Sequence, residues 1–246
     1  MPEGAALFAR YAFPPNELGY CGPTEQGWEH ALDRTRFAQE RARVVRQFDG
    51  AWPYLELIGG YHGLDPLDAR VVEAYWVGNP LIDGLDMLIW GNALDERFRS
   101  RAGTRWSAME SGIAKGRPTH AYHVFCVYPW VGLLRSGHTD HALRVMDRCR
   151  IRWGTVEAIE ADHVIVSSRP LRWDGSSLHL DEPVIEMVRI RGETPGLRLG
   201  CTLSLHWDYV CDVIDPLRQA RLADETSRHL AMVNAEQKSL AAVVEA

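Results

Sequence analysis

The spacing of apolar residues changes near residue 146, and this change constrains the fold more than any other feature of the chain. Between residues 25 and 48, apolar side chains such as Trp28, Leu32 and Val44 recur among charges at mostly helical spacing. After Cys149, strand-forming residues come in runs of four to ten, with turns between the runs. We therefore expect an α+β protein, with an all-α domain over residues 1–146 and a β-rich domain over residues 147–246.

Six segments of the first part have helical patterns. Asp65 and Pro66 mark the start of the second, because Asp is a good N-cap and Pro fits the first helical position. Gly, Pro and Ser separate the segments. The predicted helices cover residues 25–48, 65–77, 81–101, 104–114, 118–134 and 139–147.

The second part contains several short strands and no helix between them. The strand-like stretches are residues 150–159, 163–173, 183–190 and 200–214, with a turn at Asp174-Gly175. Closing such strands into a small antiparallel barrel removes the edges they would otherwise expose. From Pro216 the pattern is helical again, so we expect a barrel followed by a C-terminal helix.

Charge and cysteine usage narrow the functional classes. A net charge of -6 argues against a general nucleic-acid surface, because phosphate binding needs clustered Lys and Arg. The start of the chain lacks the basic and apolar regions of a secretory signal, and no stretch reaches eighteen apolar residues. The five cysteines are odd in number and widely spread. We expect a cytoplasmic protein with reduced thiols and neither nucleic acid nor membrane as a partner.

Two short motifs in the second part resemble a known family. Cys149, Gly154, Val156 and Ile159 follow the pattern Cys-x4-Gly-x-Val-x-x-Ile, and the step from Gly200 to His206 matches a later Gly-to-His segment of the same family. Both are similar to the HypC family, small chaperones of [NiFe]-hydrogenase maturation. The resemblance covers about residues 147–240 and includes the C-terminal helix.

The resemblance implies an OB-like barrel that carries an iron atom bearing carbonyl and cyanide ligands. Carried over by position, the iron-binding roles fall on Cys149 and His206. A thiolate is a strong donor to low-spin iron, and an imidazole can ligate it or bind a cyanide nitrogen. The implied partners are the hydrogenase maturation scaffold, the hydrogenase large subunit, or both. Unlike the family, this chain has a whole domain before the cysteine, and Trp207 follows the histidine.

The helical part has its own candidate ligands for a second iron or a haem. His120, His123 and Cys126 are spaced at three-residue steps, and His138 and His141 repeat the step. If residues 118–134 and 139–147 form a helical hairpin, the two sets converge on one metal. Aromatic packing with polar tips explains the same pattern without a metal.

Cys21 lies in a segment rich in turn residues, between Tyr20 and Gly22. It is either a reactive or ligating thiol, or part of an ordered cap over the first helix. No Walker, GxGxxG, HExxH or GxSxG string occurs in the chain, which disfavours the corresponding enzyme classes.

Two hypotheses about function follow. In the first, the chain is a maturation factor without enzymatic activity, and its helical domain docks a partner protein. In the second, the helical domain is an iron or haem enzyme that makes or transfers a diatomic ligand for the iron on the barrel.

Overall fold

The computed structural model describes residues 4–32, 38–86, 89–92, 116–127, 130–135, 137 and 139–244. Helices and strands both contribute, so the fold is a mixture of helix and sheet, as the sequence predicts. The helical elements are α1 (Gly4–Glu17), the 3-10 helix η1 (Trp28–Leu32), α2 (Ala38–Val45), α3 (Trp52–His62), α4 (Ala69–Trp76), α5 (Pro80–Asp83), α8 (His120–Tyr122), the π-helical η3 (His123–Val127), α9 (Trp130–Arg135), α10 (Thr139–Cys149) and α11 (Pro216–Val244). The strands are β1 (Arg152–Ile159), β2 (His163–Ser168), β3 (Leu171–Trp173), β4 (Leu178–Leu180), β5 (Val184–Arg189), β6 (Thr202–His206) and β7 (Tyr209–Ile214).

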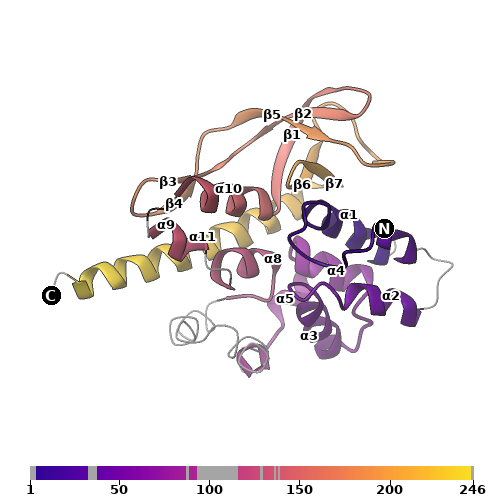
Figure 1. The fold of residues 1–246 in the computed structure, drawn as a ribbon, viewed down its shortest axis with the longest axis horizontal. Coiled ribbons are helices and arrows are strands. Elements are labelled where there is room, and N and C mark those ends of the chain that lie inside the picture. The colour runs from indigo at the N-terminus through magenta and orange to yellow at the C-terminus, as the bar shows by residue number, and fades with distance from the viewer. Residues whose placement is uncertain are drawn as a thin grey trace.

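The strands lie at one end of the molecule and helices α1 to α5 at the other (Figure 1). Helices α8 and α10 lie between them, and α11 runs past both to the C-terminus. Within the described residues, no helix combines the length and the apolar character needed to cross a bilayer.

The N-terminal helices differ from the predicted ones in several places. The stretch 25–48 contains η1 and then α2, with residues 33–37 outside the described residues, so its first part is a 3-10 helix. The N-cap of α4 is Asp68, whose carboxylate accepts the backbone N–H of Arg70 at 2.9 Å, and the predicted cap at Asp65 is wrong. Asp65 instead closes the turn before α4 by accepting the N–H of Leu67 at 2.7 Å.

Two further helices, α1 and α3, have no counterpart in the sequence analysis. Helix α1 continues through Pro14 and Pro15, in a stretch whose turn residues favour a loop. Most of the predicted helix 81–101 and all of 104–114 lie outside the described residues.

Five strands hydrogen-bond in the order β1-β2-β5-β7-β6 and close into a barrel through the β1–β6 pair. All of these pairs are antiparallel except β5 with β7, where Arg189 pairs with Tyr209. Strands β3 and β4 form a separate two-stranded sheet. The side chains inside the barrel are mostly aliphatic, because alternate residues of each strand point inward: Val156, Val164, Val166, Val188, Leu203, Leu205 and Val210.

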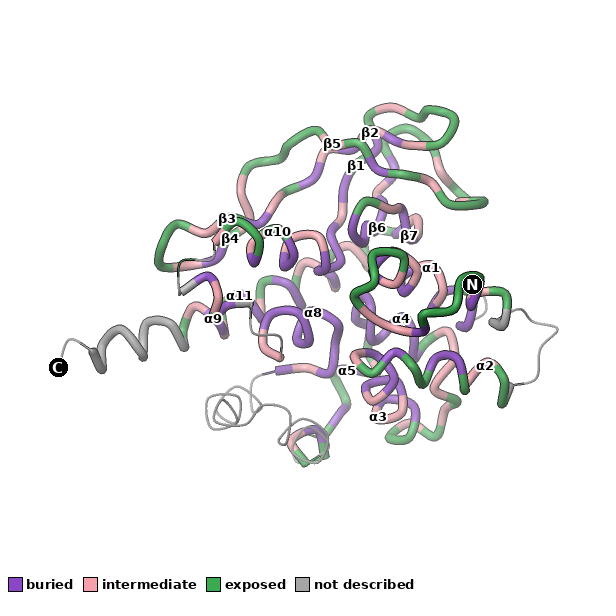
Figure 2. Tube along the Cα trace, in the orientation of Figure 1, coloured by how far each residue is buried: buried purple, intermediate pink, exposed green. Residues whose placement is uncertain are grey.

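The largest apolar core joins the two parts of the chain. It contains residues from α1, α3 and α4 together with Ile151, Ile214 and Leu222 from the second part. The hydroxyl groups of Tyr11 and Ser204, 193 residues apart, lie 2.8 Å from each other. One apolar core therefore contains residues from both sides of residue 146, whereas the barrel interior is a separate core formed by the second part alone. Buried segments occur in both parts of the chain (Figure 2).

A buried ionic cluster links the barrel to the turn between β6 and β7. The guanidinium of Arg152 is 2% exposed and binds the Glu186 carboxylate, which also accepts a hydrogen bond from Ser168. Arg152 also donates to the backbone oxygen of Trp207, and the Trp207 N–H donates to the oxygen of Arg148 at 2.7 Å. Trp207 has a φ of +52°, an uncommon conformation for a bulky residue, and these two bonds hold it there.

We expect Glu186→Gln to lower the free energy of unfolding by about 3 to 5 kcal/mol, because the change leaves the buried Arg152 guanidinium without its counter-charge. Denaturant unfolding at neutral pH measures this. The control is Glu157→Gln, an exposed carboxylate on β1 of the same barrel, which should change stability by less than about 0.5 kcal/mol. Equal effects of the two substitutions would contradict the structural role of the cluster.

Candidate metal centre

Three buried side chains, His120, Cys149 and His206, meet between the helices and the barrel. Their potential ligand atoms all lie within 4.8 Å of one another. His120 is the first residue of α8, Cys149 the last of α10 and His206 the last of β6. Each ligand is therefore held at the end of a regular element, where the chain turns at the junction.

Cys149 and His206, which the sequence analysis pairs, thus lie together. The motif resemblance places Cys149 on the first strand of the barrel, and this expectation is wrong. Cys149 ends α10, which continues two residues beyond the predicted end of that helix, and β1 begins only at Arg152. The cause is the apolar stripe of α10, in which Ala142, Val145, Met146 and Cys149 are buried at helical spacing.

The His206 side chain is oriented as a ligand would be. Its Nδ1–H donates a hydrogen bond to the Tyr11 backbone oxygen at 2.6 Å, which leaves the lone pair on Nε2. Among the described residues, this buried Nε2 atom has no hydrogen-bond partner. Histidine ligands of metals almost always donate their other ring N–H to an oxygen in this way. Tyr11 was not identified from the sequence, because a backbone oxygen leaves no signal there.

His120 has two possible tautomers. Its Nε2 lies 2.8 Å from the Cys149 backbone oxygen and 3.9 Å from the Cys149 sulfur. Its Nδ1 lies 3.2 Å from the Tyr75 hydroxyl, which itself lies 2.9 Å from the Gly50 oxygen. Because a carbonyl oxygen only accepts, Nε2–H donates to Cys149 in this structure. Metal binding at Nε2 requires the other tautomer, in which Tyr75 donates to Gly50 and Nδ1–H donates to the Tyr75 oxygen, and the ion then replaces the hydrogen bond to Cys149.

Burial keeps all three groups neutral at pH 7. It lowers the pKa of His120 to about 4 and the pKa of His206 well below its usual value. It raises the pKa of the Cys149 thiol far above its usual value. A metal ion would therefore displace one proton, from Cys149, and would bind two imidazoles that are already deprotonated.

The donor set fits a transition-metal ion. Bond lengths of about 2.3 Å to sulfur and 2.0 to 2.1 Å to nitrogen place the ligand atoms of a tetrahedral ion about 3.5 Å apart. The observed 3.9 Å between Cys149 Sγ and His120 Nε2 is close to this separation. One thiolate and two imidazoles suit iron, zinc or copper better than magnesium or calcium.

A small cavity adjoins the centre, and two more residues identified from the sequence, Cys21 and His123, line it. Its volume is about 200 Å³. The residues that line it are Pro15, Tyr20, Cys21, Phe48, Gly50, Ala51, Tyr75, Trp76, His120, His123, Val145, Cys149 and Trp207. Pockets for drug-sized ligands measure about 300 to 1,000 Å³, so this cavity fits a metal ion with small ligands but not a haem.

The predicted convergence of the two helical ligand sets does not occur in the described residues. His123 faces the cavity, and its pKa is lowered to about 3, chiefly by burial. Cys126 packs against apolar cores, and His141 is exposed on α10. His138 lies outside the described residues.

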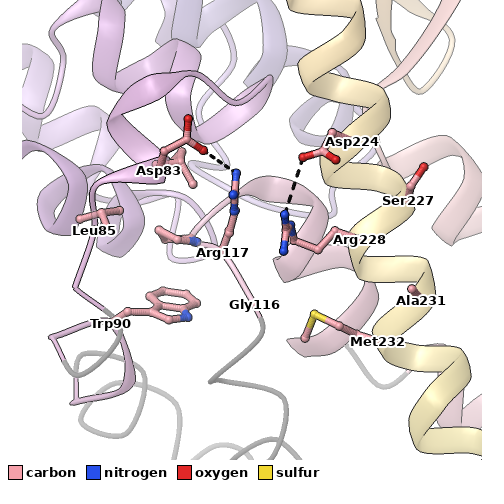
Figure 3. Close-up of a pocket in the computed structure, with 12 residues that line it drawn as sticks. Asp83, Leu85, Trp90, Gly116, Arg117, Asp224, Ser227, Arg228, Ala231 and Met232 are labelled. Atoms are coloured by element: carbon pink, nitrogen blue, oxygen red, sulfur yellow. Dashed lines mark hydrogen bonds and ion pairs between the residues drawn. The ribbon is translucent and has the colours of Figure 1, made fainter.

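A second, larger cavity of about 770 Å³ lies between α5 and α11 (Figure 3). Arg117 points into it but binds Asp83 at 2.7 Å and Glu225 at 3.0 Å. Arg228 and Asp224 form a further pair at 3.8 Å. The charges of this cavity largely compensate one another, so we place the candidate site at the smaller cavity.

The buried histidines predict a loss of stability in mild acid. An unfolded chain protonates its histidines near pH 6.5, whereas His123 stays neutral in the folded protein down to about pH 3. The unfolded state therefore binds more protons between these two pH values. The contribution of His123 to the free energy of unfolding is complete above pH 6.5 and is lost as the pH falls. Denaturant unfolding of the metal-free protein from pH 7 to 4 measures this loss.

His123→Gln should reduce the slope of stability against pH by up to about 1.4 kcal/mol per pH unit between pH 6 and 4. A slope that is the same in the wild type and in His123→Gln would show that His123 titrates normally.

The comparisons with known proteins give a family but no activity. Residues 1–240 match the model of a family of unknown function, DUF6390, and the chain belongs to this family. No curated protein and no solved structure matches the chain.

Proposed function

We propose that this member of DUF6390 binds a transition-metal ion, iron, through Cys149, His206 and His120, and carries it as an accessory factor in [NiFe]-hydrogenase maturation. The observation that carries the proposal is the meeting of Cys149 and His206, 57 positions apart in the sequence, with a second imidazole, that of His120, in one buried group. These two residues occupy the motif positions that resemble the HypC family.

The incomplete ligand set supports a carrier. Three protein ligands leave at least one coordination position of the ion open, whereas structural metal sites are closed by four. The adjoining cavity of about 200 Å³ has space for small ligands on the ion, such as carbonyl or cyanide. A buried centre with an open position can hold an ion and still exchange it.

The choice of iron and the choice of partner rest on the resemblance. The donor set alone also accepts zinc and copper. The proposed partners are the maturation scaffold and the hydrogenase large subunit, with the helical part of the chain as the docking surface. That the barrel is OB-like and related to the HypC barrel is part of the same proposal.

We expect the wild-type protein, loaded anaerobically with ferrous iron, to retain about one iron per chain after gel filtration. Cys149→Ala should lower the affinity at least about 100-fold, because a methyl group cannot replace a thiolate ligand. His206→Ala should lower it by about 10- to 100-fold. The control is Cys201→Ala, which removes a buried thiol from the barrel core and should leave the affinity unchanged. Equal iron retention by wild type and Cys149→Ala would contradict the proposed site, and a preference for zinc or copper would contradict the choice of iron.

Infrared spectroscopy tests the carrier role. The protein co-expressed with a hydrogenase maturation system should show carbonyl and cyanide bands, which fall in a spectral window where protein does not absorb. Cys149→Ala should lose these bands and should fail to support hydrogenase activity while the fold is retained, as circular dichroism would show. Iron binding without these bands in the wild type would leave a metal-binding protein with no role in hydrogenase assembly.

A further inference from the structure

The cavity beside the candidate centre contains a second thiol, that of Cys21. Cys21 and Cys149 line the same cavity, although they are 128 positions apart in the sequence. Cys149 is buried, whereas Cys21 is only partly buried. Cys21 is outside the compact group formed by His120, Cys149 and His206. The two thiols therefore share one cavity, and Cys21 is the more exposed of the two.

The loop that carries Cys21 is held in place by specific contacts. The side-chain N–H groups of Asn16 donate to the backbone oxygens of Cys21 and Pro23, both at 2.7 Å. The Trp28 indole N–H in turn donates to the Asn16 side-chain oxygen at 2.7 Å. Gly22 has a φ of +86°, and a Cβ there would come within 2.3 Å of the Phe48 ring, so the turn needs glycine. The thiol position is thus set by the fold.

Tyr20, from the same loop, also lines the cavity. The Tyr20 ring stacks on the Trp207 ring at 4.5 Å between centroids, and Tyr20 is 46% exposed. Trp207 follows the candidate ligand His206 directly and is held by the buried ionic cluster. Tyr20, Cys21 and Trp207 all line the cavity, and the thiol is the group among them that suits a soft metal ion.

We infer that Cys21 is the exchange ligand of the centre, which binds a soft metal ion first and passes it to Cys149. The inference rests on the proposed metal binding at Cys149. Burial raises the pKa of Cys21 to about 12, so its thiol stays protonated until a metal ion displaces the proton.

The transfer is a ligand exchange without redox change. The incoming ion first binds the Cys21 sulfur and displaces its proton to solvent. As the bond to the Cys149 sulfur forms, the bond to the Cys21 sulfur breaks, and the proton of Cys149 moves to Cys21. Release follows the same steps in reverse. The ion keeps its oxidation state throughout, and His120 and His206 complete the inner site.

Cobalt(II) is the probe for the test, because its thiolate bonds give charge-transfer absorption that stopped-flow instruments can follow. In the full-length protein, Cys21→Ser should slow both cobalt uptake and cobalt release to excess EDTA by at least about tenfold. The equilibrium affinity should stay within about threefold, since an exchange ligand lowers the barrier in both directions equally. Cys126→Ser, the matched change at the other partly buried cysteine, should alter neither rate.

Each other result overturns the inference. Unchanged rates in Cys21→Ser would show that the ion reaches Cys149 without binding Cys21. Faster rates would show that the Cys21 side chain only obstructs access of the ion to the centre. A loss of affinity as large as that of Cys149→Ala would make Cys21 a resident ligand. Cys21→Ala, which removes the hydroxyl as well, must give the same slowing. If the wild type binds no cobalt, the proposed metal site itself fails, which is a distinct outcome.

Discussion

The buried contact between Arg152 and Glu186 is the constraint on which the candidate centre depends. Burying a guanidinium and a carboxylate is costly unless the two are paired, so the arrangement around them has little freedom. Arg152 also donates to the backbone oxygen of Trp207, which has a positive φ directly after His206. The ionic cluster thereby fixes where β6 ends and where the His206 ring enters the junction with the helices.

The helices complete the centre from the other side. Helix α1 supplies the Tyr11 backbone oxygen that orients His206, α10 ends at Cys149, and α8 begins at His120. The apolar core shared by both parts of the chain holds the ends of these elements at fixed positions relative to one another. The candidate metal-binding group therefore depends on the whole fold, because the helices supply two of its three side chains and the oxygen that orients the third.

The sequence was sufficient to predict those features that depend on local patterns. Alternating apolar residues and turns located the strands of the barrel but not β4, and the stretches 163–173 and 200–214 each contain two strands. The motif spacing selected Cys149 and His206. The sequence also identified His120, His123 and Cys21 as candidates. It grouped the two histidines with Cys126, His138 and His141 as ligands of one metal. The pairing of His120 with Cys149 depends on how α8 packs against the end of α10, and no periodicity encodes that packing. Helix α1 was missed because Pro14 and Pro15 favour a loop locally, whereas burial of Phe8 and Tyr11 favours the helix.

The central claim is that one thiolate and two imidazoles of this chain bind a single metal ion. X-ray absorption spectroscopy of the iron-loaded protein measures the ligands directly. We expect one sulfur ligand, scattering from two imidazole rings, and loss of the sulfur contribution in Cys149→Ala. An iron environment of oxygen and nitrogen atoms alone, unchanged in that variant, would contradict the claim.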